Sequence, residues 1–278
     1  MNGIGYKIKK TILYILLILL SVVCMFPFLL MIVNATRSGS EIMKSFTLIP
    51  SVYLKENWAT VFKYFNLFLG MWNSLKVAVP STLLCAYFSA MTAYALAMYK
   101  FKGNKVLFMT ILIFMMIPGQ LGLIGFYNLC TKLHLVNSYI PLIIPAIASP
   151  GTVFFLRQYV LSVMPPSLIE AARIDGSGEF HTFNNIVLPL MKPAIAVQAI
   201  FAFVQNWNNY YTQNMILISN DKMITMPMMV QKVLGQDKKI DLGAQYAAVA
   251  LSVIPIIVIY VCLSRFIVGG VALGGVKE

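Results

Sequence analysis

The sequence predicts an all-α polytopic membrane protein with six transmembrane helices and a short helix in the loop between the fourth and fifth. Composition is the first observation behind this fold class: of 278 residues, 59% are hydrophobic and 11% are charged, and the mean hydropathy is +0.80. Such values are typical of polytopic membrane proteins rather than of soluble domains. Second, the charged residues leave six apolar intervals, each near the ~20 residues with which a helix spans a bilayer. Third, residues 165–176 have the pattern of a short polar helix.

The six intervals form one transmembrane domain that covers residues 1–278, without a repeat, linker or low-complexity tract. Lysines precede the first interval, as in a signal peptide. However, its apolar part is longer than the roughly 7 to 15 residues of a signal core, and no A-x-A-like site follows, so we expect a retained helix. The predicted spans are 11–33, 77–98, 106–125, 138–156, 193–218 and 242–264.

The net charge of +12 comes from basic residues in ones, twos and threes between apolar intervals, which favours membrane topology over nucleic-acid binding as its cause. Basic residues are almost as frequent on one side of the predicted membrane as on the other. The lysine groups nearest to the spans nevertheless favour cytoplasmic N- and C-termini, which places 157–192 in a cytoplasmic loop. These groups are Lys7, Lys9 and Lys10 before the first span, and Lys100, Lys102 and Lys105 after the second.

The predicted polar helix in this loop extends from Leu168 to Asp175. Ser167 and Glu170 have the S-x-x-E spacing of a capping box, in which each side chain satisfies a backbone N–H at the helix start. Two prolines precede the helix, and Gly176 is suited to the left-handed conformation that ends one. A helix this short is not stable alone in water, so another surface must hold it.

Two features of this helix bear on what holds it. Leu168, Ala171, Ala172 and Asp175 are expected on one side, while Glu170 and Arg173 have the spacing of an i,i+3 ion pair. An amphipathic helix lying at the lipid headgroups is the simpler alternative. The mostly alanine face offers little apolar area for that role and instead allows close approach of another backbone.

The same residues resemble a known signature. The spacing EAA-x3-G-x9-I-x-L-P is typical of the permease subunits of binding-protein-dependent ABC importers, and this chain matches it without departure. Landmarks along nearly the whole chain, among them "MIPGQ", "WNNYY" and "GGVKE", resemble the carbohydrate-uptake branch and its six-span maltose-type permease. The matching positions, with the charged residues between them, are Glu170, Ala171, Ala172, Arg173, Asp175, Gly176, Ile186, Leu188 and Pro189.

The resemblance implies a function and a set of partners. In such importers this loop docks onto a separate cytoplasmic ATPase subunit, which binds ATP and Mg. The implied assembly lies in the bacterial cytoplasmic membrane and contains this chain, a second homologous permease, two ATPase subunits and an extracytoplasmic sugar-binding protein, surrounded by lipid. No nucleic acid and no cofactor of its own are implied for this chain.

Residues of the common catalytic motifs are missing from the sequence. It has no G-x-x-x-x-G-K-[ST] phosphate loop and no G-x-S-x-G elbow, so we expect neither ATP hydrolysis nor other catalysis by this chain. His134 and His181 lack metal-ligand spacing, and the four cysteines lie in or beside apolar intervals with no C-x-x-C pattern. We therefore expect neither a metal site nor a disulfide framework.

The fifth predicted span contains several amides in an otherwise apolar stretch. Polar side chains at membrane depth face protein or a water-filled cavity, so a substrate pathway and interhelical hydrogen bonding remain equal alternatives here. Uncharged amides and aromatic faces suit a hydroxyl-rich neutral solute. Gln198, Gln205, Asn209 and Thr212 would share one helical stripe. The candidate pathway residues are Gln205, Trp207, Asn208, Asn209 and Tyr210.

The leading hypothesis is therefore a permease subunit that imports a sugar of oligosaccharide size. A permease for glycerol phosphate or a polyamine is an alternative in the same class. A membrane enzyme that acts on lipid-linked sugars would need clustered acids at a membrane face, and the only such cluster lies within the motif: Glu170, Asp175 and Glu179.

Overall fold

The structure, a computed structural model, describes residues 4–218, 220–235 and 240–274. Every regular element in these ranges is a helix, which confirms the predicted all-α fold class. The chain forms two compact units. One contains Met1–Leu67 and Met229–Ile254, and the other contains Phe68–Met228 and Pro255–Glu278.

The first unit is organised around the end of one long helix and the beginning of another. Gly243, in the first turn of α15, packs against the main chain that follows α1: a Cβ at this position would lie 1.9 Å from the carbonyl oxygen of Arg37. The buried Asn57 side chain donates to the carbonyls of Ala35 and Arg37, at 2.9 Å each. Its elements are α1 (Ile4–Ala35), α2 (Gly39–Lys44), α3 (Leu54–Tyr64), most of α14 (Met226–Leu234) and the beginning of α15 (Leu242–Gly274).

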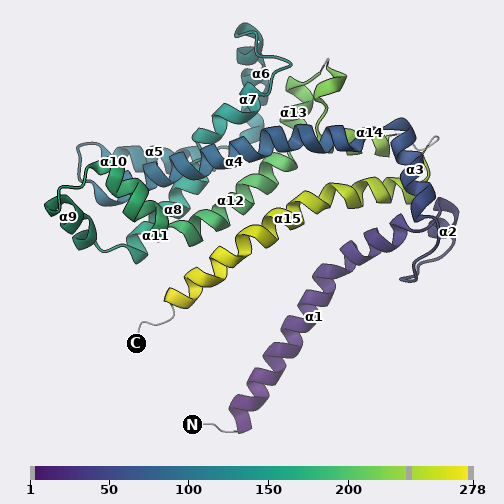
Figure 1. The fold of residues 1–278 in the computed structure, drawn as a ribbon, viewed down its shortest axis with the longest axis horizontal. Helices are drawn as coiled ribbons and strands as arrows, with labels where there is room; N and C mark the ends of the chain where they lie inside the picture. Colours follow the sequence, from purple (N-terminus) through teal and green to yellow (C-terminus); the bar gives the residue numbers. More distant parts are fainter. Residues whose placement is uncertain (1–3, 219, 236–239, 275–278) are drawn as a thin grey trace. The chain divides into compact units, whose positions relative to one another are not determined.

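The second unit contains most of the helices (Figure 1). They are α4 (Leu67–Met98), α5 (Asn104–Met116), η1 (Gly119–Gly122), α6 (Leu123–Lys132), α7 (Ile140–Ile143), η2 (Ile144–Ile147), α8 (Pro150–Val163), α9 (Pro166–Ile174), α10 (Glu179–Thr182), the π-helical η3 (Phe183–Val187), α11 (Leu188–Leu190), α12 (Lys192–Trp207), α13 (Tyr210–Ile216), η4 (Asp221–Met223), the first residues of α14 and the second half of α15.

Within the described residues, four helical segments are long and apolar enough to cross a membrane by themselves, and two bent helix pairs bring the number to six if each pair is one span. The six-span count stays a prediction. The four single segments are Tyr6–Ala35, Leu67–Met98, Ile140–Val163 and Leu242–Ile267, and each is longer than the interval predicted for it.

Charged residues inside helices explain two of these extensions. The prediction begins the second span at 77, after Lys76, but α4 begins at Leu67 and the Lys76 ammonium lies 5.7 Å from the centroid of the Trp72 ring. Likewise, the prediction ends the fourth span before Arg157, but α8 continues to Val163. The Arg157 guanidinium lies 3.9 Å from the centroid of the Phe108 ring. A long basic side chain packed on an aromatic face does not end a helix.

The third and fifth predicted spans are not straight helices. At Pro118 the chain turns by 90° between Asn104–Met116 and Gly119–Lys132, because proline lacks an N–H and disfavours the helical conformation of the residue before it. The predicted fifth span, 193–218, contains α12 and α13, separated by Asn208 and Asn209. A second bend, of 80°, separates Glu179–Leu190 from Lys192–Trp207.

A hydrophobic core in the second unit holds the loop between α8 and α12 in place. It joins α4, α8 and α9 to the π-helical segment and the beginning of α12. Its buried members include Ala93 and Tyr94 of α4, Leu156 of α8, Ile169 of α9 and Phe183 of η3. The segment that carries the EAA motif is therefore packed against the core of its own unit.

Candidate functional site

The motif helix, α9, begins differently from the prediction. Its N-cap is Pro165, in an extended conformation, and no side chain caps it. Proline is favoured at the first helical position, so Pro166 fixes the start there and leaves Ser167 inside the first turn. The predicted capping box of Ser167 and Glu170 is therefore wrong, although the same spacing does form one at α2, between Ser38 and Glu41.

The end of α9 agrees with the prediction for Gly176, which adopts a φ of +78°. The Gly176 N–H donates to the carbonyl of Arg173 at 3.0 Å, and the Ser177 N–H donates to the carbonyl of Ala172 at 2.9 Å. This pair of bonds is a Schellman motif, which satisfies the last carbonyls of the helix and redirects the chain. A Cβ at Gly176 would meet nothing within 4 Å, so only its backbone conformation requires glycine.

One face of α9 packs against the core, and it divides the set of residues that was predicted to share one side of the helix. Ile169 is 3% exposed and Ala172 is 6% exposed, with Leu168 packed beside them. Ala171 and Asp175, which were expected on the same side as Leu168 and Ala172, are exposed. The phase of the helix is set by Ile169, because its larger apolar side chain gains more from burial than that of Ala171.

The opposite face of the loop leaves large apolar side chains in contact with solvent. Ile174 is 86% exposed at the end of α9, and Phe180 is 70% exposed in α10. Glu170 and Ala171 are also exposed, on the side of α9 that faces away from its buried residues. Exposed apolar groups beside polar ones are typical of a surface that binds another protein.

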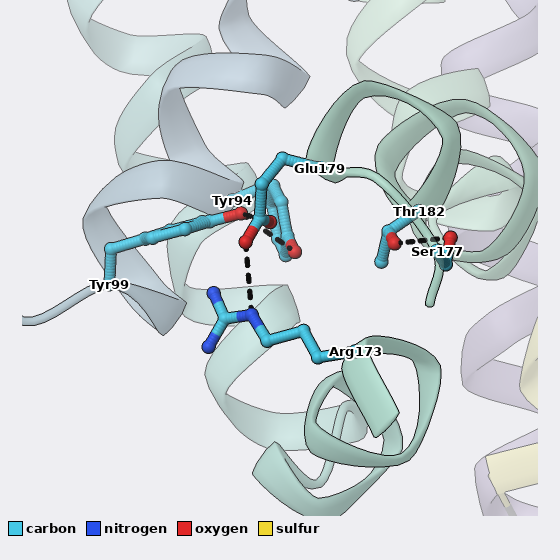
Figure 2. Close-up of polar contacts among 6 residues, drawn as sticks. All are labelled: Tyr94, Tyr99, Arg173, Ser177, Glu179 and Thr182. Carbon is cyan, nitrogen blue, oxygen red and sulfur yellow. Dashed lines mark hydrogen bonds and ion pairs between the residues drawn. The ribbon is translucent and has the colours of Figure 1, made fainter. Parts of the chain in front are cut away.

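Glu179, rather than Glu170, is the acidic partner of Arg173 (Figure 2). The Arg173 Nε lies 3.0 Å from Glu179 Oε1, so the predicted i,i+3 pair within α9 is wrong. Glu179 also accepts a hydrogen bond from the hydroxyl of Tyr99, which follows the end of α4. The Arg173 guanidinium lies 5.2 Å from the centroid of the Tyr99 ring. We call Tyr99, Arg173 and Glu179 the loop triad.

The loop triad shifts the pKa of each of its members. The hydrogen bond from Tyr99, followed by that from Arg173, lowers the pKa of the Glu179 carboxyl, although partial burial opposes the shift. Burial and the bond to Glu179 raise the pKa of Tyr99 above its ordinary range. The bond to Glu179 raises the pKa of Arg173. The charged carboxylate and the neutral phenol are thus the stable pair at neutral pH.

The second half of the EAA motif begins the turn into α12. Ile186 lies in the π-helical segment, Leu188 packs against the core, and Pro189 is exposed in the first turn of α11. The hydroxyls of Ser177 and Thr182 are 2.8 Å apart, which joins the end of α9 to α10. These contacts connect the first half of the motif, in α9, to the second half, in η3 and α11.

The break between α12 and α13 places the candidate pathway residues in different surroundings. Trp207 is 2% exposed and stacks on Phe203, with 5.6 Å between ring centroids. Asn209 caps α13 by accepting a hydrogen bond from the Thr212 N–H at 3.2 Å. Asn208 forms the break itself and is exposed, and Tyr210 begins α13. A broken helix explains the amides, because side chains must satisfy the backbone groups that are freed there.

A cavity of about 470 Å³ lies beside this break, and we call it the polar cavity after the amides and hydroxyls in its otherwise mostly apolar lining. From the predicted stripe it is lined by Gln205, Asn209 and Thr212, and also by Asn206. Gln198, Trp207, Asn208 and Tyr210 are not among the lining residues. The structure therefore brings together two of the five candidate pathway residues, Gln205 and Asn209.

Several functional candidates were missed by sequence reasoning. Phe126 and Ser149 line the cavity from segments distant in the sequence, and no local pattern singles them out. Tyr99 and Glu179 belong to the loop triad, and nothing in their local pattern indicates that they meet. Among the described residues, no group of three His, Cys, Asp or Glu side chains is arranged to hold a metal ion.

Comparisons with known proteins agree on one class. Residues 83–272 match the family described as the binding-protein-dependent transport system inner membrane component. The chain is 36% identical over 262 residues to the arabinooligosaccharides transport system permease protein AraQ of Halalkalibacterium halodurans, with 92% of each chain covered. It is 31% identical over 261 residues to the diacetylchitobiose uptake system permease protein NgcG of Streptomyces coelicolor, which covers 93% of this chain and 86% of that one.

A solved structure is similar to the fold over almost its whole length. It is a bacterial ABC transporter involved in the import of the acidic polysaccharide alginate, and it matches with a TM-score of 0.78. The match covers 95% of this chain and 98% of that chain, at 19% identity, which establishes a shared fold.

Proposed function

This chain belongs to the family of binding-protein-dependent transport system inner membrane components, and we propose that it is the permease subunit of an ATP-driven importer for a neutral oligosaccharide. The observation that carries the choice of cargo is the cavity beside the α12–α13 break. Its lining contains amides, hydroxyls and an aromatic ring but no charged side chain. Amides donate to and accept from sugar hydroxyls, and an aromatic face stacks on a sugar ring.

The lining argues against the two other solutes in the same class. A glycerol phosphate would require a basic side chain to neutralise its phosphate, and a polyamine would require acids, because an unpaired charge is costly to desolvate. Gln205 is the lining amide best placed for a solute, since it is exposed and its side chain makes no hydrogen bond within the described part of the chain. The names of the two relatives above, which refer to sugar uptake, support the same choice.

The EAA loop supports a docking role toward a separate ATPase subunit. α9 is anchored through Ile169, ended by a Schellman motif at Gly176, and exposes Ile174 on its outer side. A preformed helix loses little conformational entropy when it docks, which favours tight binding. We assign ATP and Mg to that subunit, and no catalytic step and no cofactor to this chain.

The complete assembly follows from the same proposal. It contains this chain, a second homologous permease, two ATPase subunits and an extracytoplasmic sugar-binding protein in the bacterial inner membrane. Both termini and the EAA loop, 157–192, lie in the cytoplasm. A membrane enzyme for lipid-linked sugars is disfavoured, because Glu179 of the only acidic cluster is paired with Arg173 and Tyr99.

Uptake in cells tests the proposal. A strain that lacks this chain, and the same strain with the chain restored, are compared for uptake of labelled arabinooligosaccharides, diacetylchitobiose, glycerol 3-phosphate and spermidine. Restoration of uptake for a sugar alone is the expected result. Restoration for glycerol 3-phosphate or spermidine would reject the cargo class, and ATP hydrolysis by the purified chain alone would reject the division between subunits.

A further inference from the structure

A second cavity, of about 640 Å³, lies at the connection between α4 and α5. It is separate from the polar cavity beside the α12–α13 break, and the two share no lining residue. Four basic side chains line it, and no acidic side chain does. The basic residues are Lys100, Lys102, Lys105 and Arg157.

Hydrogen bonds hold the walls of this basic cavity in a defined shape. Gly103 turns the chain with a φ of +95°. The Asn104 side chain donates to the carbonyls of Leu96, at 3.2 Å, and Tyr99, at 2.9 Å. From α8, the Arg157 Nε donates to the same Leu96 carbonyl at 3.3 Å. The guanidinium is therefore positioned by the protein, rather than being one more mobile surface charge.

The positive charge of the basic cavity is not neutralised within the described part of the chain. None of the four bases forms an ion pair there, and Glu179 of the neighbouring loop is paired with Arg173 instead. Gly103 provides no side-chain cap for α5, so the first N–H groups of that helix add partial positive charge beside Lys105. An anion with several acceptor oxygens matches this arrangement.

Apolar side chains continue from the basic cavity along α5. Val106, which lines the cavity, is 68% exposed, and Leu107 in the same helix turn is 52% exposed. Phe101 is 42% exposed on the connection itself. A ligand with an anionic head and an apolar tail would contact both surfaces at once, whereas a free anion would use only the first.

We propose that the basic cavity binds the phosphate group of an anionic phospholipid, whose acyl chains lie along α5. Lysines placed by the positive-inside rule alone would serve at any position in a short loop. Here they surround a cavity together with an arginine from a distant helix, and basic pockets between membrane helices are suited to phosphate headgroups. The site is independent of the proposed cargo, and it shares Tyr99 with the loop triad.

The test measures which lipids stay with the assembled transporter. The complete complex is placed in vesicles with equal parts of phosphatidylglycerol and phosphatidylcholine, then extracted, and the ratio of the two lipids retained is measured by mass spectrometry. We expect a ratio that favours phosphatidylglycerol. Each lysine near an anionic lipid surface contributes a factor of about five. The triple variant Lys100→Gln, Lys102→Gln, Lys105→Gln should therefore lower the preference by roughly tenfold to a hundredfold.

Two matched variants separate the cavity from general surface charge. Lys7→Gln, Lys9→Gln, Lys10→Gln removes the same charge from α1, none of whose residues lines the cavity. This variant should lower the ratio much less than the glutamine triple variant of the cavity, because it removes only general surface charge. Replacing Lys100, Lys102 and Lys105 with arginine should preserve the preference. An equal loss in all three variants would overturn the proposal, as would an unchanged ratio in the glutamine triple variant.

Two further outcomes bear on the ligand. If inorganic phosphate at moderate concentration removes the retained phosphatidylglycerol, the cavity is a free-anion site and the lipid assignment is wrong. If the glutamine variant does not assemble, wild-type complex is extracted at increasing salt. A lipid preference that falls with salt supports the proposal, and one that does not change contradicts it.

Discussion

The Tyr99 hydroxyl donates a hydrogen bond to Glu179, which joins the end of α4 to the first turn of α10 (Figure 2). The two residues are far apart in the sequence, yet each contacts Arg173 of the motif helix. A movement of the end of α4 would therefore shift Arg173 and Glu179, which belong to the loop that is proposed to dock onto the ATPase.

Tyr99→Phe is predicted to weaken the loop at neutral pH but not in acid. Hydrogen bonds to charged groups contribute about 1.5–3 kcal/mol when buried, and solvent screening reduces this to about 1 kcal/mol or less here. Because the pKa of Glu179 is lowered, the stabilisation is complete above the unfolded-state value of about 4.3 and is lost as pH falls through the folded-state value. The check is the thermal unfolding of wild type and variant from neutral to acidic pH. A difference in melting temperature that becomes larger in acid would contradict the assignment.

Arg173 is predicted to act with Glu179 and not with Glu170. A double-mutant cycle of Arg173→Gln with Glu179→Gln should give a measurable coupling, because the two side chains form an ion pair. The control cycle with Glu170→Gln should give none. Thermal unfolding provides both values. Equal coupling energies in the two cycles would show that Arg173 also interacts with Glu170, and would contradict the assignment of Glu179 as its partner.

Gly176→Val is predicted to disconnect ATP hydrolysis from solute binding while the membrane helices still insert. A β-branched residue at a φ of +78° is strained by roughly 1–3 kcal/mol, which re-aims the turn after α9. ATPase activity of the purified complex is measured with and without loaded binding protein, together with recovery of the ATPase subunit.

Gly178→Val is the matched control for this change. Gly178 has a φ of −68° and is also open to solvent, so valine there adds the same side chain without backbone strain. We expect nearly normal stimulation in Gly178→Val. Normal stimulation and normal subunit recovery in Gly176→Val would rule out the docking role of α9.

Gln205→Ala and Trp207→Ala are predicted to fail for different reasons. Gln205 lines the polar cavity, so its loss should reduce uptake several-fold without lowering recovery of the complex. Trp207 is buried against Phe203 and should lower recovery, since truncating a buried tryptophan costs about 3–5 kcal/mol. Asn208→Ala, exposed and outside the cavity lining, is the control. A Gln205→Ala complex with normal specific uptake would remove this residue from the pathway.

A cysteine at position 52 is predicted to react with an impermeant thiol reagent in intact cells, whereas one at Ser177 is not. Val52 is 86% exposed, so accessibility depends only on the side of the membrane. The native cysteines are first replaced, because Cys24 and Cys262 are exposed. Labelling at Ser177 without labelling at position 52 would reverse the proposed orientation.

The sequence determined the all-α class, the places of the apolar helices and the spacing of the EAA motif. These depend on local physics: apolar length, helix punctuation by proline and glycine, and the left-handed conformation that Gly176 accepts. Each can be recognised within a short window, because the residues that carry the signal are neighbours in the chain. The glycine prediction succeeded for this reason.

Tertiary structure decided which residues meet. Packing of Ile169 against core residues of α4, α8 and η3 selected the face of α9 that is buried. Arg173 was free to pair with Glu170, but the fold brought Glu179 and Tyr99 to it from other elements. Such choices depend on contacts between segments distant in sequence. A polar side chain in a membrane helix must face protein or water, and only the positions of the neighbouring helices decide which.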